Sequence, residues 1–180
     1  MSECLSCLDL TKRFGAKEAL RSVNFKLEKG RIVGLLGPNG SGKTTLLKLV
    51  SGLLQPTDGS VLIEGMPPGI ETKRKVSYLP DQMYLGDWMR VRDIIEYFQD
   101  FYEDFDGDRA RAMLETLGIR PSQKIRAMSK GTREKVQLIL VMSRRASLYC
   151  LDEPIAGVDP AGRDYILSVI LTIFRRTPPC

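Results

Sequence analysis

A glycine-rich loop joins an apolar run to a helix-forming stretch early in the chain. The loop has the spacing Gly-x-x-x-x-Gly-Lys-Thr and consists of Gly37, Pro38, Asn39, Gly40, Ser41, Gly42, Lys43 and Thr44. In such a loop the glycines let successive backbone N–H groups turn towards phosphate oxygens, and the N-terminus of the next helix adds its dipole. A glycine-rich turn can also serve only as a connection. The complete match between an apolar run and a helix favours phosphate binding, so we predict a nucleotide site.

Two side chains of this loop have the chemistry that a nucleoside triphosphate requires. We expect Lys43 to reach the β- and γ-phosphates and Thr44 to offer its hydroxyl to Mg²⁺. Thr45, at the start of the helix-forming stretch, is included among the predicted nucleotide-binding residues. The sequence has no Asn-Lys-x-Asp motif of the kind that reads guanine, which favours ATP over GTP.

Two adjacent carboxylates, Asp152 and Glu153, follow the apolar stretch Ser147–Leu151, which is predicted to be a buried strand. In a phosphate-loop protein the first carboxylate can hold Mg²⁺ through water. The second can accept the proton of the water that attacks the γ-phosphorus. The alternative is an ordinary strand end with solvated acids. The upstream phosphate loop favours the catalytic interpretation.

The elements around these residues predict an α/β domain. A chain of 180 residues with 43% hydrophobic and 27% charged residues is typical of one globular domain. The continuous apolar run Ile32–Leu36 is typical of a buried parallel strand. The other short stretches with strand patterns are Cys4–Leu10, Val23–Leu27, Val61–Ile63 and Val76–Leu79.

A stretch with helical periodicity, about residues 88–130, interrupts the strand pattern. Its first helix is predicted to bury one apolar face, made of Ile94, Ile95, Tyr97 and Phe98. A second helix over residues 108–117 is predicted to be capped by Asp108. A further helix is predicted over residues 132–145. We therefore expect an all-helical insert between two strand-rich parts.

Charge and cysteine content disfavour several other functions. The formal net charge is +5, from 27 Lys and Arg against 22 Asp and Glu, and the basic residues are scattered, so we expect no nucleic acid partner. Four cysteines (Cys4, Cys7, Cys150, Cys180) without any histidine make a poor zinc site. The sequence has neither an apolar run long enough to span a membrane nor an N-terminal signal peptide, which predicts a cytoplasmic location.

These motifs together resemble the nucleotide-binding subunit of ABC transporters over nearly the whole chain. Gly37–Thr44 is similar to the Walker A motif, and Ser147–Glu153 to the Walker B motif with its catalytic glutamate. Phe14 lies where the family has its adenine-stacking aromatic; covering the sheet edge is its alternative role. Gln82 corresponds to the glutamine of the Q-loop, and Asp159 to the aspartate of the D-loop.

The family signature, Leu-Ser-Gly-Gly-Gln, has a variant counterpart in Met128–Thr132. Ser129 and Gly131 are kept, and they supply a hydroxyl and a bare backbone N–H at a helix N-terminus, where both can contact a γ-phosphate. Lys130 and Thr132 depart from the pattern. The Ser-Lys-Gly variant resembles bacterial exporter-type subunits that pair with a separate membrane protein.

The resemblance implies a P-loop NTPase core with a parallel sheet, an N-terminal antiparallel β part and a helical signature subdomain over about residues 88–130. It implies ATP hydrolysis with Mg²⁺ in a head-to-tail homodimer or heterodimer. Gln82 would contact the γ-phosphate and Mg²⁺, and the insert would grip a transmembrane permease subunit at the inner face of the cell membrane. The alternatives are a soluble ABC ATPase of repair or translation, which would show tandem cassettes or a coiled-coil insertion, and a catalytically weak remnant.

The end of the chain supports the second alternative. A helix after Asp159 is followed by Arg175–Cys180, where two prolines cannot serve a central strand. The resemblance implies a next strand between the Walker A and Walker B strands, leading to a switch histidine, and the chain has no histidine. We therefore expect a shortened cassette with weak turnover. Either the Ile32–Leu36 and Ser147–Leu151 strands pair directly, or the chain is marginally stable.

Overall fold

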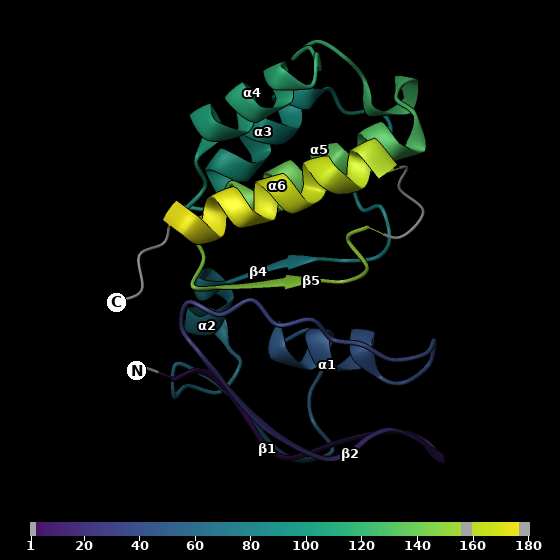
Figure 1. The fold of residues 1–180 in the computed structure, drawn as a ribbon, viewed down its shortest axis with the longest axis vertical. Coiled ribbons are helices and arrows are strands. Elements are labelled where there is room, and N and C mark those ends of the chain that lie inside the picture. Colours follow the sequence, from purple (N-terminus) through teal and green to yellow (C-terminus); the bar gives the residue numbers. More distant parts are fainter. Residues whose placement is uncertain (1–2, 156–159, 177–180) are drawn as a thin grey trace. The chain divides into compact units, whose positions relative to one another are not determined.

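The computed structural model describes residues 3–155 and 160–176, which form two compact units (Figure 1). Of the described residues, one unit comprises 3–78, 147–152 and 174–176, and we call it the β unit. The other comprises residues 79–146, 153–155 and 160–173, and we call it the helical unit. Each has its own hydrophobic core.

An antiparallel sheet of three strands is the larger of the two sheets in the β unit. Its central strand β1 (Glu3–Phe14) pairs on one side with β2 (Lys17–Glu28) and on the other with β3 (Asp58–Ile63). The hairpin between β1 and β2 turns at Gly15, whose φ of +58 lies in the left-handed region that glycine adopts without strain. The predicted N-terminal antiparallel β part is therefore present, with strands longer than the sequence pattern indicated.

Helix α1 (Lys43–Val50) follows the phosphate loop and packs into the core of the β unit. Its apolar residues Leu46, Leu49 and Val50 are buried with Leu10, Val61 and other side chains of the sheet. A second, shorter pair of strands shares this core. These are β4 (Val76–Leu79), which follows α2 (Ile70–Lys75), and β5 (Leu148–Leu151), and the two arrows point the same way in Figure 1.

The predicted strand Ile32–Leu36 is the main correction to the sequence analysis. Residues 31–38 carry no strand or helix, and the four apolar side chains of this segment are between 45% and 94% exposed. The cause is the lack of a neighbour, because a strand is held by hydrogen bonds to another strand. Within the described residues β5 pairs with β4, so direct pairing of β5 with residues 32–36 is not observed.

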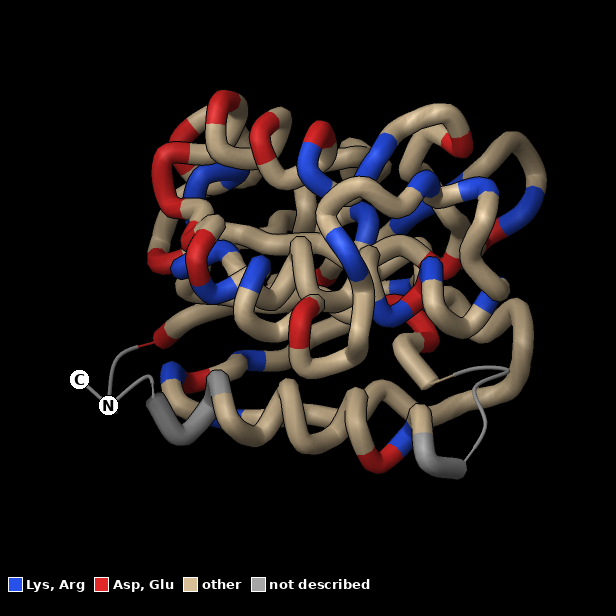
Figure 2. Tube along the Cα trace, turned by 90° about the horizontal axis from the view of Figure 1, so that it is seen from above, with Lys and Arg blue, Asp and Glu red and all other residues tan. Residues whose placement is uncertain are grey.

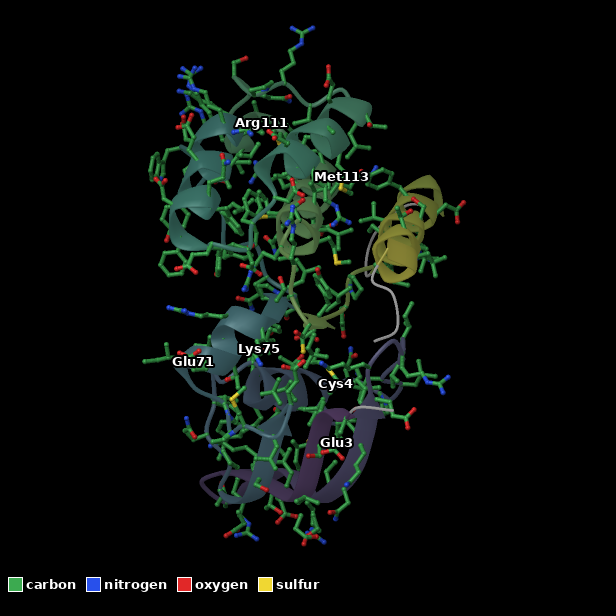
Figure 3. All side chains as sticks on the ribbon, turned by 90° about the vertical axis from the view of Figure 1, so that its left-hand side faces the viewer. Glu3, Cys4, Glu71, Lys75, Arg111 and Met113 are labelled. Carbon is green, nitrogen blue, oxygen red and sulfur yellow. The ribbon has the colours of Figure 1, made fainter. Side chains whose placement is uncertain are left out.

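The helical unit contains α3 (Val91–Phe101), α4 (Gly107–Thr116), the 3₁₀ turn η1 (Ile125–Ala127), α5 (Lys130–Met142) and most of α6 (Pro160–Arg176). Its core gathers apolar residues of α3, α4 and α5, with Met113 of α4 (Figure 3) packed against them. Arg144 lies in this unit almost fully buried, where its Nε donates to both carboxylate oxygens of Asp104 at 3.1 and 3.2 Å. The helical unit thus has a core of its own, which extends beyond residues 88–130 because α5 contributes to it.

Two details of the helical prediction are wrong. Tyr97 does not join the buried face of α3; it is exposed and stacks on Phe101 with ring centroids 5.9 Å apart. Helix α4 is capped by Asp106, whose side chain accepts a hydrogen bond from the Arg109 N–H at 3.0 Å, and not by Asp108. No helix in the described part of the chain is long and apolar enough to cross a membrane.

Candidate nucleotide-binding site

The phosphate loop takes its shape from two glycines with left-handed backbones. Gly40 has φ +82 and Gly42 has φ +94, values that other residues reach only with strain. A Cβ on Gly42 would lie 2.5 Å from the Ala19 carbonyl oxygen of β2, so the loop is pressed against that strand. The N–H of Leu46 already donates to the Gly42 carbonyl at 2.9 Å. Helix α1 therefore begins directly at the loop, as a phosphate site requires.

The ammonium group of Lys43 lies against this loop. Its Nζ donates to the carbonyl oxygens of Gly37 at 2.9 Å and of Pro38 at 3.0 Å. The first turn of α1 contains no acidic residue that would repel an anion. The backbone N–H groups of this turn, including those of Thr44 and Thr45, have no earlier helical carbonyl to bind. Positive charge and free N–H donors therefore meet at one end of α1.

Asp152 and Thr44 come together at this end of the β unit. The Thr44 hydroxyl donates to Asp152 Oδ1 at 3.1 Å, although the two residues are 108 positions apart. Asp152 is only 2% exposed, and its second oxygen lies 3.5 Å from the Tyr78 hydroxyl. Tyr78 belongs to β4, and no sequence signal singled it out. Only the pairing of β4 with β5 brings the two side chains together.

A hydroxyl and a carboxylate fit Mg²⁺, which prefers oxygen ligands and usually keeps several waters and phosphate oxygens. In residues 3–155 and 160–176 no group of three or more His, Cys, Asp or Glu side chains could hold a metal ion by itself. The protein would therefore supply only part of the coordination. The cysteines are not candidates, since burial raises the pKa of the Cys7 thiol to about 11 and that of Cys150 to about 12.

Phe14 is the last residue of β1 and not part of a loop. Its ring is 48% exposed, and the Lys12 ammonium lies 5.1 Å from the ring centroid. An exposed ring at a strand end can stack on a flat base. Both interpretations given by the sequence, base stacking and cover of the sheet edge, are compatible with this position.

The other predicted site residues that the structure describes belong to the helical unit. Ser129 is the N-cap of α5, where its Oγ accepts from the Thr132 N–H at 3.2 Å. A Cβ on Gly131 would meet nothing within 4 Å, so packing does not explain this glycine, whereas close approach of a ligand would. Glu153 is exposed and has φ +48, an uncommon backbone conformation for a residue other than glycine. Asp159 lies outside the described residues.

Gln82 presents an exposed side chain, while its backbone is held from within the same unit. Its carbonyl oxygen accepts a hydrogen bond from the side chain of Gln137 at 3.2 Å. Gln137 was not predicted as a site residue. The only signal that could have found it is an amide among the apolar residues of α5.

Comparison with known proteins agrees with these motifs. The model of the family described as ABC transporter matches residues 20–156, which include the phosphate loop, Gln82, Ser129 and Asp152. The chain belongs to the ABC transporter family. The resemblance inferred from the sequence is therefore confirmed.

Two ABC relatives and one solved structure show how far the similarity extends. The SkfA peptide export ATP-binding protein SkfE of Bacillus subtilis is 32% identical over 170 residues, which cover 91% of this chain and 71% of SkfE. The linearmycin resistance ATP-binding protein LnrL of the same organism is 30% identical, with 92% of this chain and 56% of LnrL covered. A putative ABC transporter ATP-binding protein from Pyrococcus furiosus has a TM-score of 0.83 at 30% identity, covering 96% of this chain and 86% of that one.

The solved ABC structure confirms the predicted α/β P-loop NTPase fold. The chain spans about half the length of the curated relatives it matches, 46% and 56% of the first two.

Proposed function

We propose that this chain binds ATP with Mg²⁺ and hydrolyses it as the nucleotide-binding part of an ABC transporter. One observation carries the proposal: the Thr44 hydroxyl meets the Asp152 carboxylate at 3.1 Å. This contact brings the C-terminal end of β5 to the N-terminal end of α1. Ligands of open α/β sheets bind at such strand ends, and phosphates bind at such helix N-termini.

The residues of the β unit would bind and orient the nucleotide. The N–H groups from Gly40 to Thr45 would donate to the phosphate oxygens, and the Lys43 ammonium would leave the carbonyls of Gly37 and Pro38 for the β- and γ-phosphates. Phe14 would stack on the adenine. Thr44 and Asp152 would hold Mg²⁺, which, when bound, neutralises phosphate charge.

Glu153 is proposed as the general base. Its carboxylate would accept a proton from the water that attacks the γ-phosphorus, and its exposure leaves it open to that water. Gln82 would orient the same water and contact Mg²⁺. Ser129 and Gly131 would contact the γ-phosphate of ATP held by a second nucleotide-binding subunit, identical or different, packed head to tail, with Asp159 at the same interface.

The proposed partner of the helical unit is a transmembrane permease subunit at the inner face of the cell membrane. The name of the relative SkfE refers to peptide export and supports an export function; that of LnrL refers to linearmycin resistance. The separate core of the helical unit supports its proposed role as the part that docks on the permease, because such a unit can move as one body.

The test compares Glu153→Gln with Glu115→Gln, which removes an exposed carboxylate on α4. We expect Glu153→Gln to bind ATP with unchanged affinity and to hydrolyse it about 100-fold more slowly or worse, the usual scale for loss of a general base. Glu115→Gln should match the wild type. If the wild-type chain binds ATP but does not hydrolyse it, the chain is a catalytically weak remnant. If it does not bind ATP, the proposal is rejected.

A further inference from the structure

Gln137 is a polar side chain in the most apolar stretch of α5. It is only 4% exposed, and its neighbours Val136, Leu138, Ile139 and Leu140 are buried as well. A buried amide is costly unless its hydrogen-bonding groups are satisfied. The buried amide therefore needs specific hydrogen-bond partners, and these are present in the structure.

The Gln137 amide is satisfied by the backbone of one loop. Its Nε2 donates to the carbonyl oxygens of Pro80 at 3.3 Å and of Gln82 at 3.2 Å. Its Oε1 accepts from the N–H of Tyr84 at 3.4 Å. The opposite orientation of the amide would place its oxygen against two carbonyl oxygens. The hydrogen-bond partners therefore determine which amide position is the nitrogen and which is the oxygen.

The loop that Gln137 holds has no regular structure of its own. Strand β4 ends at Leu79 and α3 begins at Val91, and residues 80–84 between them form neither a helix nor a strand. The side chain of Gln82 is exposed, so the contacts made through its carbonyl constrain where that side chain starts. The backbone of this loop is positioned by a side chain from α5.

The same helix carries the signature residues. Ser129 caps α5, and Gln137 lies about two turns further along it. A regular helix is rigid over two turns, so a movement of residues 80–84 would be transmitted through the amide to Ser129 and Gly131. These hydrogen bonds and α5 all lie within the helical unit.

We propose that Gln137 is a positioning residue that makes the Gln82 loop and the signature end of α5 move as one piece during ATP hydrolysis. This inference rests on the proposed ATPase function. Gln137 does not touch nucleotide; it acts through Gln82 and Ser129. Loss of the amide should therefore change turnover and leave nucleotide binding unchanged, because the phosphate loop, Phe14 and Asp152, which are proposed to hold the chain's own ATP and Mg²⁺, are in the β unit.

The test replaces the amide by a side chain of similar length, Gln137→Met, in the full chain. The control is Gln99→Met on α3, which removes an exposed amide that accepts from Arg111 (Figure 3) at 2.8 Å. Three quantities are measured for each variant: ATP affinity by equilibrium titration, steady-state kcat and KM, and amide hydrogen exchange of Tyr84. Gln137→Glu, which keeps an acceptor for the Tyr84 N–H but loses both donors, is the intermediate case.

We expect Gln137→Met to lower kcat about 10- to 100-fold with KM for ATP within about twofold of wild type, a scale typical of misplaced groups. Exchange of the Tyr84 amide should become about fivefold faster or more, as expected for one lost hydrogen bond. Gln99→Met should change neither. Gln137→Glu should keep part of the Tyr84 protection but not the turnover.

Two results would overturn the inference by itself. One is normal kcat in Gln137→Met together with faster Tyr84 exchange, which would make the amide merely structural. The other is equal loss of ATP affinity and kcat, which would point to damage of the whole fold. A wild-type chain that fails to bind ATP would instead overturn the proposed function, and the coupling role with it.

Discussion

The two segments that flank the phosphate loop differ sharply, although both belong to the β unit. Downstream, α1 is a regular helix whose Leu49 is fully buried. Upstream, Ile32–Leu36 is just as apolar, yet it has no regular structure and Leu36 is 94% exposed. A helix satisfies its backbone hydrogen bonds within itself, whereas a strand depends on a neighbour. The defined conformation of the loop therefore depends on the helix that follows it.

The largest expected effect tests whether this difference holds in solution. Leu49→Ala should lower the free energy of unfolding by about 3–5 kcal/mol, because it removes a fully buried side chain and leaves a cavity. Leu36→Ala should change it by less than about 0.5 kcal/mol, as is usual for exposed positions. Urea denaturation measures both. A large cost for Leu36→Ala would mean that another part of the chain or a second molecule covers this segment.

The second prediction tests whether binding depends on the helical side of the loop. Lys43→Ala should weaken ATP binding by about 10- to 150-fold, since it removes a charged contact worth about 1.5–3 kcal/mol. Lys48→Ala removes a lysine from the last turn of the same helix and should leave the affinity within about twofold. Isothermal titration compares the two. Similar losses in both variants would indicate a general effect of positive charge and would reject a specific role for Lys43.

The third prediction concerns the junction between the two segments. Gly42→Ala should cost about 2 kcal/mol of stability, because the new Cβ would lie 2.5 Å from the Ala19 carbonyl oxygen and the backbone has φ +94. Gly40→Ala faces open space at φ +82 and should cost only the backbone strain, about 1 kcal/mol. Thermal unfolding distinguishes them. Equal costs would show that β2 does not restrain the loop.

The smallest effect concerns the start of the exposed segment. Glu64 accepts ion pairs from Lys29 at 2.7 Å and from Lys75 (Figure 3) at 2.6 Å, and Lys29 directly precedes Gly30 and the exposed residues. Hydrogen bonds from Lys29 and Lys75 lower the pKa of Glu64 to about 2. Because the folded pKa lies below the usual 4.5, this stabilisation is present above pH 4.5 and is lost as the pH falls towards 2.

Glu64→Gln should therefore cost about 1 kcal/mol at pH 7, since the paired lysines are partly solvated, and the cost should shrink as the pH falls from 4.5 towards 2. Glu71→Gln on α2 (Figure 3), an exposed carboxylate of the same unit, is the control and should show no such dependence. Urea denaturation across this pH range is the measurement. A cost that persists unchanged at pH 2 would mean that charge pairing is not the cause.

Figure 2 shows Lys and Arg spread along the trace without a single basic block, as the sequence indicated. Other predictions from sequence that the structure matches are also local. The helix after the phosphate loop and the helix that Ser129 opens need only nearby residues. The predicted cap at Asp108 is wrong by two positions because Asp106, directly before the helix, offers the same carboxylate. The predicted burial of Tyr97 is wrong because helical periodicity places this residue near the edge of the apolar face, where packing decides exposure.

Motifs and local patterns in the sequence indicate the family, the phosphate loop, the carboxylate pair and most of the helices, because each depends on residues close together in the chain; α2 was not predicted. Which partners those residues meet depends on the packing of distant segments. It brought Asp152 to Thr44 and Tyr78, and it brought Gln137 to the loop of Gln82. It also left Ile32–Leu36 exposed, where the apolar pattern alone had indicated burial. The physical reason is the same in each case: hydrogen bonds and burial between distant segments depend on a neighbour that a local pattern does not specify.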